Sequence, residues 1–313
     1  MSRVLVIKLG YRHELENVVS TDVSLASIVR STVILNQFRD DEVVWLTTAA
    51  AVPLLEGIPC VTKVLVYDAH VSLALSYDSF DVVVNLEPGW EFCALAESVN
   101  ARFRFGFALD DSAENVVALP GAERALALEL YAATRRKETR PFQQVLYEVM
   151  GRDWQGERFL LGHRPTSGEE FDLGFNMSVG KLGQNRAWPL EHWRELEELL
   201  VGRYSISYEQ RTRDVQGAME WLNSCRTIVT CDTLGLYLAL ALRKKVVALF
   251  GPTSAACCHT YGRGVKLTPP VKLNCIPCCD TECRFAKSCV HTISPRQVAD
   301  AVELLSHADV VES

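Results

Sequence analysis

The sequence predicts an α/β fold with two doubly wound halves, each built around a parallel sheet. Short apolar runs rich in β-branched residues alternate with helix-like segments, and this alternation restarts near residue 171 after a polar, glycine-containing segment at 151–170. Continuous apolar strands between helices are typical of a parallel sheet covered on both faces. We therefore expect domains at residues 1–160 and 161–293, and a final helix within 294–313 that packs back toward the N-terminal domain.

The individual elements follow from the same pattern. In the first half, strands are expected at 3–9, 42–46, 62–67, 80–86 and 101–107, and helical segments at 24–38, 91–99, 121–136 and 141–150. In the second half, strands are expected at 171–177, 204–208, 226–230, 246–250 and 264–268. Helices are expected after Pro189, at 214–223, after Thr233 and after Ser294, where Pro189 and Pro295 suit a first helical turn. Two successive α/β halves predict a central cleft between the two sheets.

Composition excludes several classes of protein. The chain has 313 residues, 48% of them hydrophobic, and a formal net charge of −7. That balance provides no extended basic surface for nucleic acid, although small anionic ligands remain compatible with it. The first apolar run is too short for a secretory signal, and no run approaches the ~20 apolar residues of a membrane-spanning helix. A cytoplasmic location is therefore predicted, and contact with the inner face of the membrane is left open.

Polar residues stand at the ends of two apolar strands. Asp232 and Thr233 follow one strand and begin a helix, whose unpaired N–H groups suit a phosphate, and Gly235 would let a ligand approach the first turn. The simpler alternative is that Asp232 or Thr233 only caps the helix. The next strand ends in Gly251, Pro252 and Thr253, which offer backbone and hydroxyl donors at the same edge of the sheet.

Two cations precede the helix that starts after Pro189. Lys181 and Arg186 lie in a loop at the sheet edge, where they could neutralise a diphosphate. Each, taken alone, is equally consistent with an ordinary solvated surface charge.

Three blocks of the second half resemble glycosyltransferase family 9, the ADP-heptose heptosyltransferases of lipopolysaccharide core assembly. The blocks are NRAWPLEHWRELEELL (185–200), CRTIVTCDTLGLYLALALRKKVVALFGPTS (225–254) and CIPCCDTECRFAKSCVHTISPRQV (275–298). In the first half, residues 4–10 and 42–59 also fit the family. The resemblance implies a GT-B fold, in which two Rossmann-like domains face a cleft. It also implies a nucleotide sugar in the C-terminal domain, an acceptor in the N-terminal one, and no metal required for transfer.

The resemblance also implies roles for single residues. Asp232 and Thr233 would lie at the phosphate and sugar end of the donor, and Arg186 would replace a diphosphate-binding lysine. Gly251, Pro252 and Thr253 would border this site. The adenosine ribose would be contacted by the residues after the strand at 204–208, namely Tyr208, Glu209 and Gln210.

Two family positions are altered. Ser27 stands where the family has the aspartate thought to deprotonate the acceptor, and Tyr237 stands in place of a histidine. A serine hydroxyl does not act as a base near neutral pH without help. Asp22 is the nearest substitute in sequence, and Glu87, just past a strand end, is a second candidate. An insert after the first strand adds His13, Glu14 and Glu16, all more typical of a solvated loop.

Cysteines are concentrated near the C-terminus. The chain has 11, and the segment CIPCCDTECRFAKSC contains Cys275, Cys278, Cys279, Cys283 and Cys289. Thiolates at this spacing can hold Zn, Fe or an iron–sulfur cluster, and some members of the family bind iron in this loop. We expect Cys275, Cys278, Cys283 and Cys289 to be the ligands of a structural metal. A loop of free thiols is the alternative.

The resemblance implies an inverting glycosyltransferase that moves a sugar, here a heptose from ADP-heptose, to an acceptor hydroxyl. The expected partners are a nucleotide diphosphate sugar and a glycan, lipid-linked or protein acceptor, without nucleic acid. The alternative is a degenerate relative that binds nucleotide or glycan, or supports a partner, without turnover; Ser27 and Tyr237 favour it.

Overall fold

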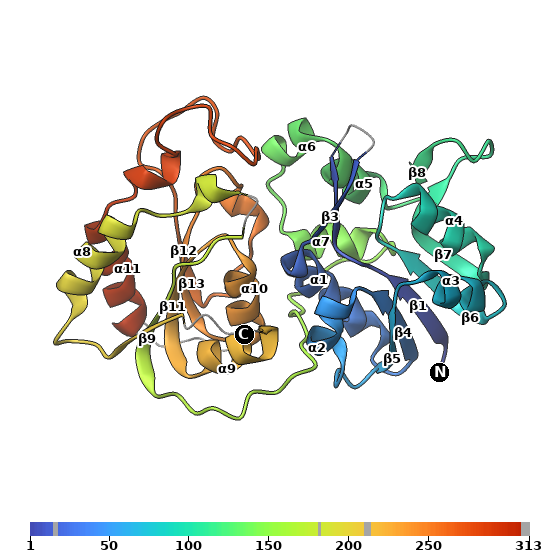
Figure 1. Cartoon of the computed structure of the whole chain (residues 1–313), viewed down its shortest axis with the longest axis horizontal. Helices are drawn as coiled ribbons and strands as arrows, with labels where there is room; N and C mark the ends of the chain where they lie inside the picture. The colour runs from blue at the N-terminus through green and yellow to red at the C-terminus, as the bar shows by residue number, and fades with distance from the viewer. Residues whose placement is uncertain (15–17, 181–182, 210–213, 308–313) are drawn as a thin grey trace. The chain divides into compact units, whose positions relative to one another are not determined.

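The computed structural model describes residues 1–14, 18–180, 183–209 and 214–307, and of residues 12–14 and 18–22 it describes only the backbone. The chain divides into two compact units (Figure 1). Unit 1 consists of residues 1–134 and 140–164, and unit 2 consists of residues 135–139 and 165–313. Each unit contains one main sheet with helices packed on it.

The sheet of unit 1 has the strand order β5-β4-β1-β6-β7-β8. Its strands are β1 (Arg3–Ile7), β4 (Glu42–Thr47), β5 (Val61–Val66), β6 (Ser79–Asn85), β7 (Asn100–Leu109) and β8 (Val116–Ala118). All neighbouring pairs are parallel except β7 with β8. The central strands are buried, as the apolar runs predict: Val4, Leu5, Val6 and Ile7 of β1 have no exposed surface.

Helices cover the sheet of unit 1. They are α1 (Leu25–Ser31), α2 (Val52–Leu55), α3 (Ala69–Ser76), α4 (Trp90–Ser98), α5 (Glu123–Leu130), α7 (Phe142–Glu148), and the 3-10 helices η1 (Thr32–Phe38) and η2 (Ala49–Ala51). One core joins Leu5, Ile7 and Leu46 of the sheet to Phe92 and Leu95 of α4. Helix α6 (Ala132–Lys137) crosses from unit 1 into unit 2.

The sheet of unit 2 is parallel throughout, with the order β10-β9-β11-β12-β13. Its strands are β9 (Phe171–Asn176), β10 (Ile206–Tyr208), β11 (Cys225–Cys231), β12 (Lys245–Leu249) and β13 (Gly264–Leu267). Its helices are α8 (Leu190–Leu200), α9 (Val215–Asn223), α10 (Leu234–Ala241) and α11 (Pro295–His307), with 3-10 helices η3 (Gln184–Arg186), η4 (Ala255–Cys257) and η5 (Cys289–Thr292). Figure 1 shows α8 and α11 on one face of this sheet and α9 and α10 on the other.

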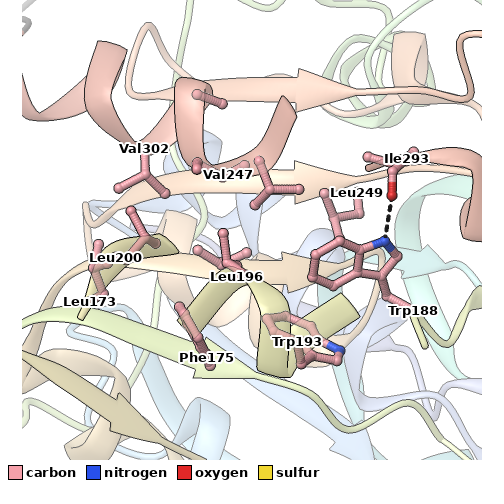
Figure 2. Close-up of a cluster of buried hydrophobic side chains, with 14 of the residues drawn as sticks. Leu173, Phe175, Trp188, Trp193, Leu196, Leu200, Val247, Leu249, Ile293 and Val302 are labelled. Atoms are coloured by element: carbon pink, nitrogen blue, oxygen red, sulfur yellow. Dashed lines mark hydrogen bonds between the residues drawn. The ribbon is translucent and has the colours of Figure 1, made fainter. Parts of the chain in front are cut away.

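The core beneath α8 and α11 anchors the loop that carries Arg186. Trp188 and Trp193 are buried and pack edge to face at 5.0 Å between ring centroids, against Phe175 and Leu196. The indole N–H of Trp188 donates to the carbonyl of Ile293 at 2.9 Å (Figure 2). Trp188, two residues after Arg186, is therefore hydrogen-bonded to the segment that leads into α11.

Helix α11 completes this core. Val298, Ala299 and Val302 are buried in the same cluster as Leu196 and Leu200 of α8 (Figure 2 shows Val302, Leu196 and Leu200). Packing of residues 294–313 toward the N-terminal domain stays a prediction, whereas the apolar face of α11 is used inside unit 2. The physical reason is that the sheet of unit 2 has an apolar face that α8 alone does not cover.

Several elements differ from the sequence prediction. The insert after β1 forms an antiparallel hairpin of β2 (Tyr11–Glu14) and β3 (Val18–Val23). The helix expected at 24–38 changes to 3-10 geometry at Thr32, and the helix expected at 121–136 is interrupted at Tyr131, whose backbone is extended. Within the described ranges, no helix combines the length and apolar character needed to cross a bilayer.

Candidate donor-binding site and its surroundings

The turn from β11 to α10 is the centre of the candidate site. Thr233 occupies the N-cap position of α10 with an extended backbone, but its side chain makes no capping hydrogen bond. Its hydroxyl oxygen instead accepts from the side-chain amide of Asn176 at 3.2 Å. The helix-cap alternative therefore does not describe the side chain of Thr233, and the N–H groups of the first turn are not capped by it.

Asp232 is buried beside this turn and held by Tyr237. The Tyr237 hydroxyl donates to Asp232 Oδ1 at 2.9 Å, and the two side chains are 3% and 8% exposed respectively. Tyr237, in the histidine position, thus contributes a phenolic donor that orients the Asp232 carboxylate. A buried carboxylate without such a donor would be costly.

Arg186 reaches the same turn from η3. Its Nη1 donates to the backbone carbonyl of Asp232 at 2.9 Å. Gly183 has a positive φ of 93°, and a Cβ at this position would overlap the guanidinium of Arg186. Gly183 and the buried anchor Trp188 therefore place a guanidinium at the amino end of α10. Lys181 lies outside the described residues.

The loop after β12 lies at the same edge of the sheet. Cys231 and Leu249 are paired in the parallel register of β11 and β12, so Asp232 and Gly251 both follow the carboxyl ends of adjacent strands. The Pro252 carbonyl accepts from the backbone N–H of Cys279 at 2.8 Å. Thr253 Oγ1 is buried and has no hydrogen-bond partner among the described residues. The predicted set Gly251, Pro252 and Thr253 therefore borders the β11–α10 turn on one side and the cysteine loop on the other.

Glu209 and Tyr208 stand at the end of the edge strand β10. Glu209 Oε2 accepts from the backbone N–H of Ser178 at 3.1 Å, which connects it to the end of β9. Burial and a hydrogen bond to Glu197 raise the pKa of Tyr208. Gln210 is outside the described residues.

Asn176 is a further residue of the candidate site, and the sequence did not predict it. It is the last residue of β9, pairs with Thr230 of β11 in register, and is 4% exposed. A Cβ on Gly235 would overlap its amide nitrogen. We expected the missing side chain of Gly235 to leave room for a ligand. That room is instead occupied by the side-chain amide of Asn176. The available signal was a polar residue at the carboxyl end of an apolar strand.

The acceptor-side candidates behave differently from one another. Ser27 is in the first turn of α1, where its backbone N–H donates to Ser24 Oγ at 3.3 Å. The side chain of Asp22 lies outside the described residues. Ser27 itself carries no carboxylate, in contrast to the aspartate that the family has at this position.

Glu87 has the contacts of a structural residue. Its side chain is fully buried, and Oε1 accepts from the backbone N–H groups of Leu9 at 2.8 Å and Gly10 at 2.6 Å. The ammonium of Lys8 lies 3.1 Å from the same oxygen, donates to the Leu86 carbonyl, and is 2% exposed. A carboxylate engaged in this way is not accessible to an acceptor hydroxyl, so these contacts favour a structural role over a catalytic one.

The four predicted metal ligands line one pocket of about 740 Å³ in unit 2, together with Asn185, His192, Phe285 and Lys287. Burial raises the pKa of the Cys278 and Cys289 thiols. Across the described ranges, no group of three or more His, Cys, Asp or Glu side chains is arranged to hold a metal ion. In this arrangement the thiols share a pocket without forming a coordination shell.

The cysteine loop is also tied to the donor-side residues. Asn185, next to Arg186, donates through Nδ2 to the Asp280 carbonyl at 2.9 Å, and the Ser288 hydroxyl donates to the Asn185 carbonyl. Arg136 donates to the Cys278 carbonyl at 2.6 Å and pairs with the Asp280 carboxylate at 3.0 Å. The loop therefore packs against the segment that carries Arg186.

Comparison with models of known protein families gives a match in the second half of the chain. A family model described as "Glycosyltransferase family 9 (heptosyltransferase)" matches residues 213–289, which include the β11–α10 turn. This match confirms the resemblance to glycosyltransferase family 9. No curated protein matches the chain.

Solved structures of family 9 share the fold over nearly the whole chain. A family 9 glycosyltransferase from Veillonella parvula DSM 2008 has a TM-score of 0.65 at 15% identity and covers 97% of each chain. The E. coli heptosyltransferase WaaC with ADP-2-deoxy-2-fluoro heptose has a TM-score of 0.62 at 14% identity and covers 96% of this chain and 99% of WaaC. The predicted α/β fold of the GT-B type is confirmed, and the family match with these structures supports a glycosyltransferase enzyme.

A third solved structure also shares the fold. It is the bacterial iron-containing dodecameric glycosyltransferase TibC from enterotoxigenic E. coli H10407, with a TM-score of 0.58 at 12% identity. The match covers 98% of this chain and 79% of TibC.

Proposed function

We propose that this protein transfers a sugar, a heptose, from ADP-heptose to an acceptor hydroxyl with inversion at the anomeric carbon. The observation that carries the proposal is the edge of the unit 2 sheet. There Arg186, the uncapped start of α10 and the loop at Gly251 converge, and this combination suits a diphosphate. The family match over residues 213–289 includes two of these three features.

In the proposed reaction, the acceptor oxygen forms a bond to the anomeric carbon while the bond from that carbon to the diphosphate oxygen breaks. The acceptor proton passes to a base, and the leaving diphosphate gains negative charge. Arg186 and the N–H groups of α10 would stabilise that charge, which is the main electrostatic contribution these residues can make. Asp232, whose Oδ1 accepts from the Tyr237 hydroxyl, would accept from a donor-sugar hydroxyl.

Of the groups that this reaction needs, the base that accepts the acceptor proton has the least support among the described side chains. Ser27 replaces the family aspartate, and Glu87 is enclosed by Lys8 and two backbone N–H groups. Asp22 therefore remains the proposed substitute, because it lies close to α1 in sequence. The acceptor itself is proposed only as a hydroxyl on a glycan, a lipid-linked sugar or a protein.

The second candidate function is nucleotide binding without turnover, as expected of a degenerate relative. The observation that favours it is the absence of a carboxylate at Ser27, combined with the loss of the family histidine at Tyr237. Donor binding is expected under both functions, and turnover under the first alone.

Calorimetry with ADP, ADP-heptose, UDP and GDP, followed by donor-hydrolysis and transfer assays, tests both functions. We expect ADP-containing ligands to bind and Arg186→Gln to weaken diphosphate binding by about tenfold or more, the usual effect of losing a charge-assisted hydrogen bond. Arg203→Gln is the matched control. Arg203 lies on the surface of unit 2, where it forms an ion pair with Glu303 and donates to the Leu199 carbonyl of α8. Failure of all four ligands to bind would eliminate both functions, and binding without transfer to any acceptor would favour the second.

We also propose that the four pocket-lining cysteines hold a structural iron or zinc, as the sequence predicts. The support is their shared pocket, and the side chains would have to rotate toward one another to bind an ion. Metal analysis and the visible spectrum of anaerobically purified protein would distinguish iron, zinc and neither. Retention of metal by a Cys278→Ser and Cys283→Ser double variant would contradict the assignment.

A further inference from the structure

Asn176 sits where two strands and one helix start meet. It ends β9, pairs in register with Thr230 of β11, and is almost completely buried. Because paired residues of a parallel sheet direct their side chains to the same face, Asn176 and Thr230 meet above the carboxyl end of the sheet. Thr233, three residues further along, comes within reach of both.

The hydrogen bonds of this group have a defined polarity. Asn176 Nδ2 donates to Thr230 Oγ1 at 2.7 Å and to Thr233 Oγ1 at 3.2 Å, which uses both amide hydrogens. The Thr230 hydroxyl donates its own hydrogen to the carbonyl of Cys231 at 2.9 Å. Both threonine oxygens therefore act as acceptors toward Asn176.

The hydroxyl hydrogen of Thr233 is the one donor of this group not yet assigned. Among the described residues, the acceptor recorded for it is Thr230 Oγ1 at 3.4 Å, which is long for a bond between hydroxyls. Thr233 is partly exposed at the start of α10, and Arg186 donates to the carbonyl of the preceding residue, Asp232, at 2.9 Å. Its hydrogen is thus available to an anionic oxygen outside the protein.

Gly235 preserves this arrangement. A Cβ at residue 235 would overlap the amide nitrogen of Asn176, so any larger residue would displace the amide from Thr233. The small residue in the first turn of α10 is therefore required by a side chain from another strand.

We propose that Asn176 is a positioning residue for donor binding. By donating to Thr233 Oγ1, it turns the Thr233 hydroxyl into a hydrogen-bond donor aimed at the diphosphate of the nucleotide sugar. This inference rests on the proposed function, and it adds a residue outside the matched segment 213–289 to the donor site. Asn176 does not touch the ligand; it acts through Thr233.

The test compares a nucleoside diphosphate with its nucleoside by calorimetry: ADP with adenosine, and the UDP and GDP pairs in parallel. Asn176→Ala should lower ADP affinity by about tenfold, the effect of losing a hydrogen bond to a charged group, and leave adenosine affinity unchanged. Asn176→Asp should lower ADP affinity further, because its carboxylate would accept from Thr233 and add negative charge. Thr233→Val should match Asn176→Ala, and the double variant should lose no more than either single one. Thr233→Ser keeps the hydroxyl and should retain ADP affinity.

Ser207→Ala serves as the structural control, because it removes the buried acceptor of the Trp221 indole N–H in the same sheet without touching this group. It should lower stability and leave the ratio of ADP to adenosine affinity unchanged. Equal losses of ADP and adenosine affinity in Asn176→Ala, or additive losses in the double variant, would overturn the inference. If Asn176→Ala does not fold, equal ADP affinities of Thr233→Val and Thr233→Ser would overturn it. Wild-type protein that binds none of the three diphosphates would remove the proposed function itself.

Discussion

Replacing Glu87 by glutamine tests whether this residue supports the fold or the chemistry. Glu87→Gln preserves the shape of the side chain and removes the charge opposite Lys8, which lies 3.1 Å away and is 2% exposed. Removing one partner of a buried ion pair costs about 3–5 kcal/mol, and Lys8 would keep only the more distant, partly exposed carboxylate of Glu129 at 3.7 Å. At about 2–4 °C per kcal/mol for a unit of this size, the melting temperature of unit 1 should fall by about 6–20 °C.

The pH dependence of this contribution follows from Lys8. Burial acts to lower the pKa of Lys8, but the attraction of Glu87 and Glu129 outweighs it, and the pKa is raised above its ordinary value of 10.5. A cation with a raised pKa in the folded state stabilises the protein fully below its ordinary pKa and loses that contribution as pH rises through the raised value. The stabilisation should therefore be constant through the neutral range and decline only in alkali above pH 10.5.

Thermal and urea unfolding of Glu87→Gln, measured beside a transfer assay, decide the question. The matched control is Asp78→Asn, which breaks the partly exposed pair with Arg3 in the same unit and should cost at most about 1 kcal/mol. Glu87→Gln protein that unfolds like wild type but has lost transfer would refute the structural interpretation and make Glu87 a candidate base.

Three further substitutions probe the two units. Ser27→Asp should raise the transfer rate by about tenfold or more if residue 27 occupies the base position, whereas an unchanged rate would point to a base elsewhere. Gly235→Ala should destabilise the protein by about 1–3 kcal/mol in urea unfolding and weaken ADP binding, because its Cβ overlaps the Asn176 amide; wild-type stability and affinity would contradict that packing. Tyr237→Phe removes the donor to Asp232 and should cost about 1–3 kcal/mol in stability, with weaker donor binding by calorimetry. Wild-type affinity in that variant would show that the Asp232 carboxylate needs no orientation by the phenol.

The strand and helix pattern was predictable wherever burial imposes a continuous apolar run. Strands β1, β4, β6, β9, β11 and β12 coincide closely with the expected runs, because central parallel strands must be apolar on both faces. The hairpin β2–β3 was missed because its sequence is largely polar and carries no such run. The break at Tyr131 was missed because a helical pattern does not reveal where the backbone turns extended.

The site was predictable where it is local in sequence. Asp232, Thr233 and Gly251 follow recognisable strand ends, so their position at one sheet edge could be inferred. The contact of Asn176 with Thr233 joins residues 57 positions apart, and the enclosure of Glu87 depends on a lysine 79 positions away across β1 and β6. Such pairs depend on strand order, which composition and spacing do not specify.

The position of α11 bears on how the protein is made. Residues 295–307 supply Val298, Val302 and Leu305 to the core of unit 2, and the segment just before them supplies the acceptor for the Trp188 indole. On the ribosome, the part of the unit 2 sheet that α11 covers therefore stays exposed until residues 295–307 have emerged. Truncation of the chain before Ile293 would leave that face open to aggregation and the Arg186 loop without the acceptor of its Trp188 anchor.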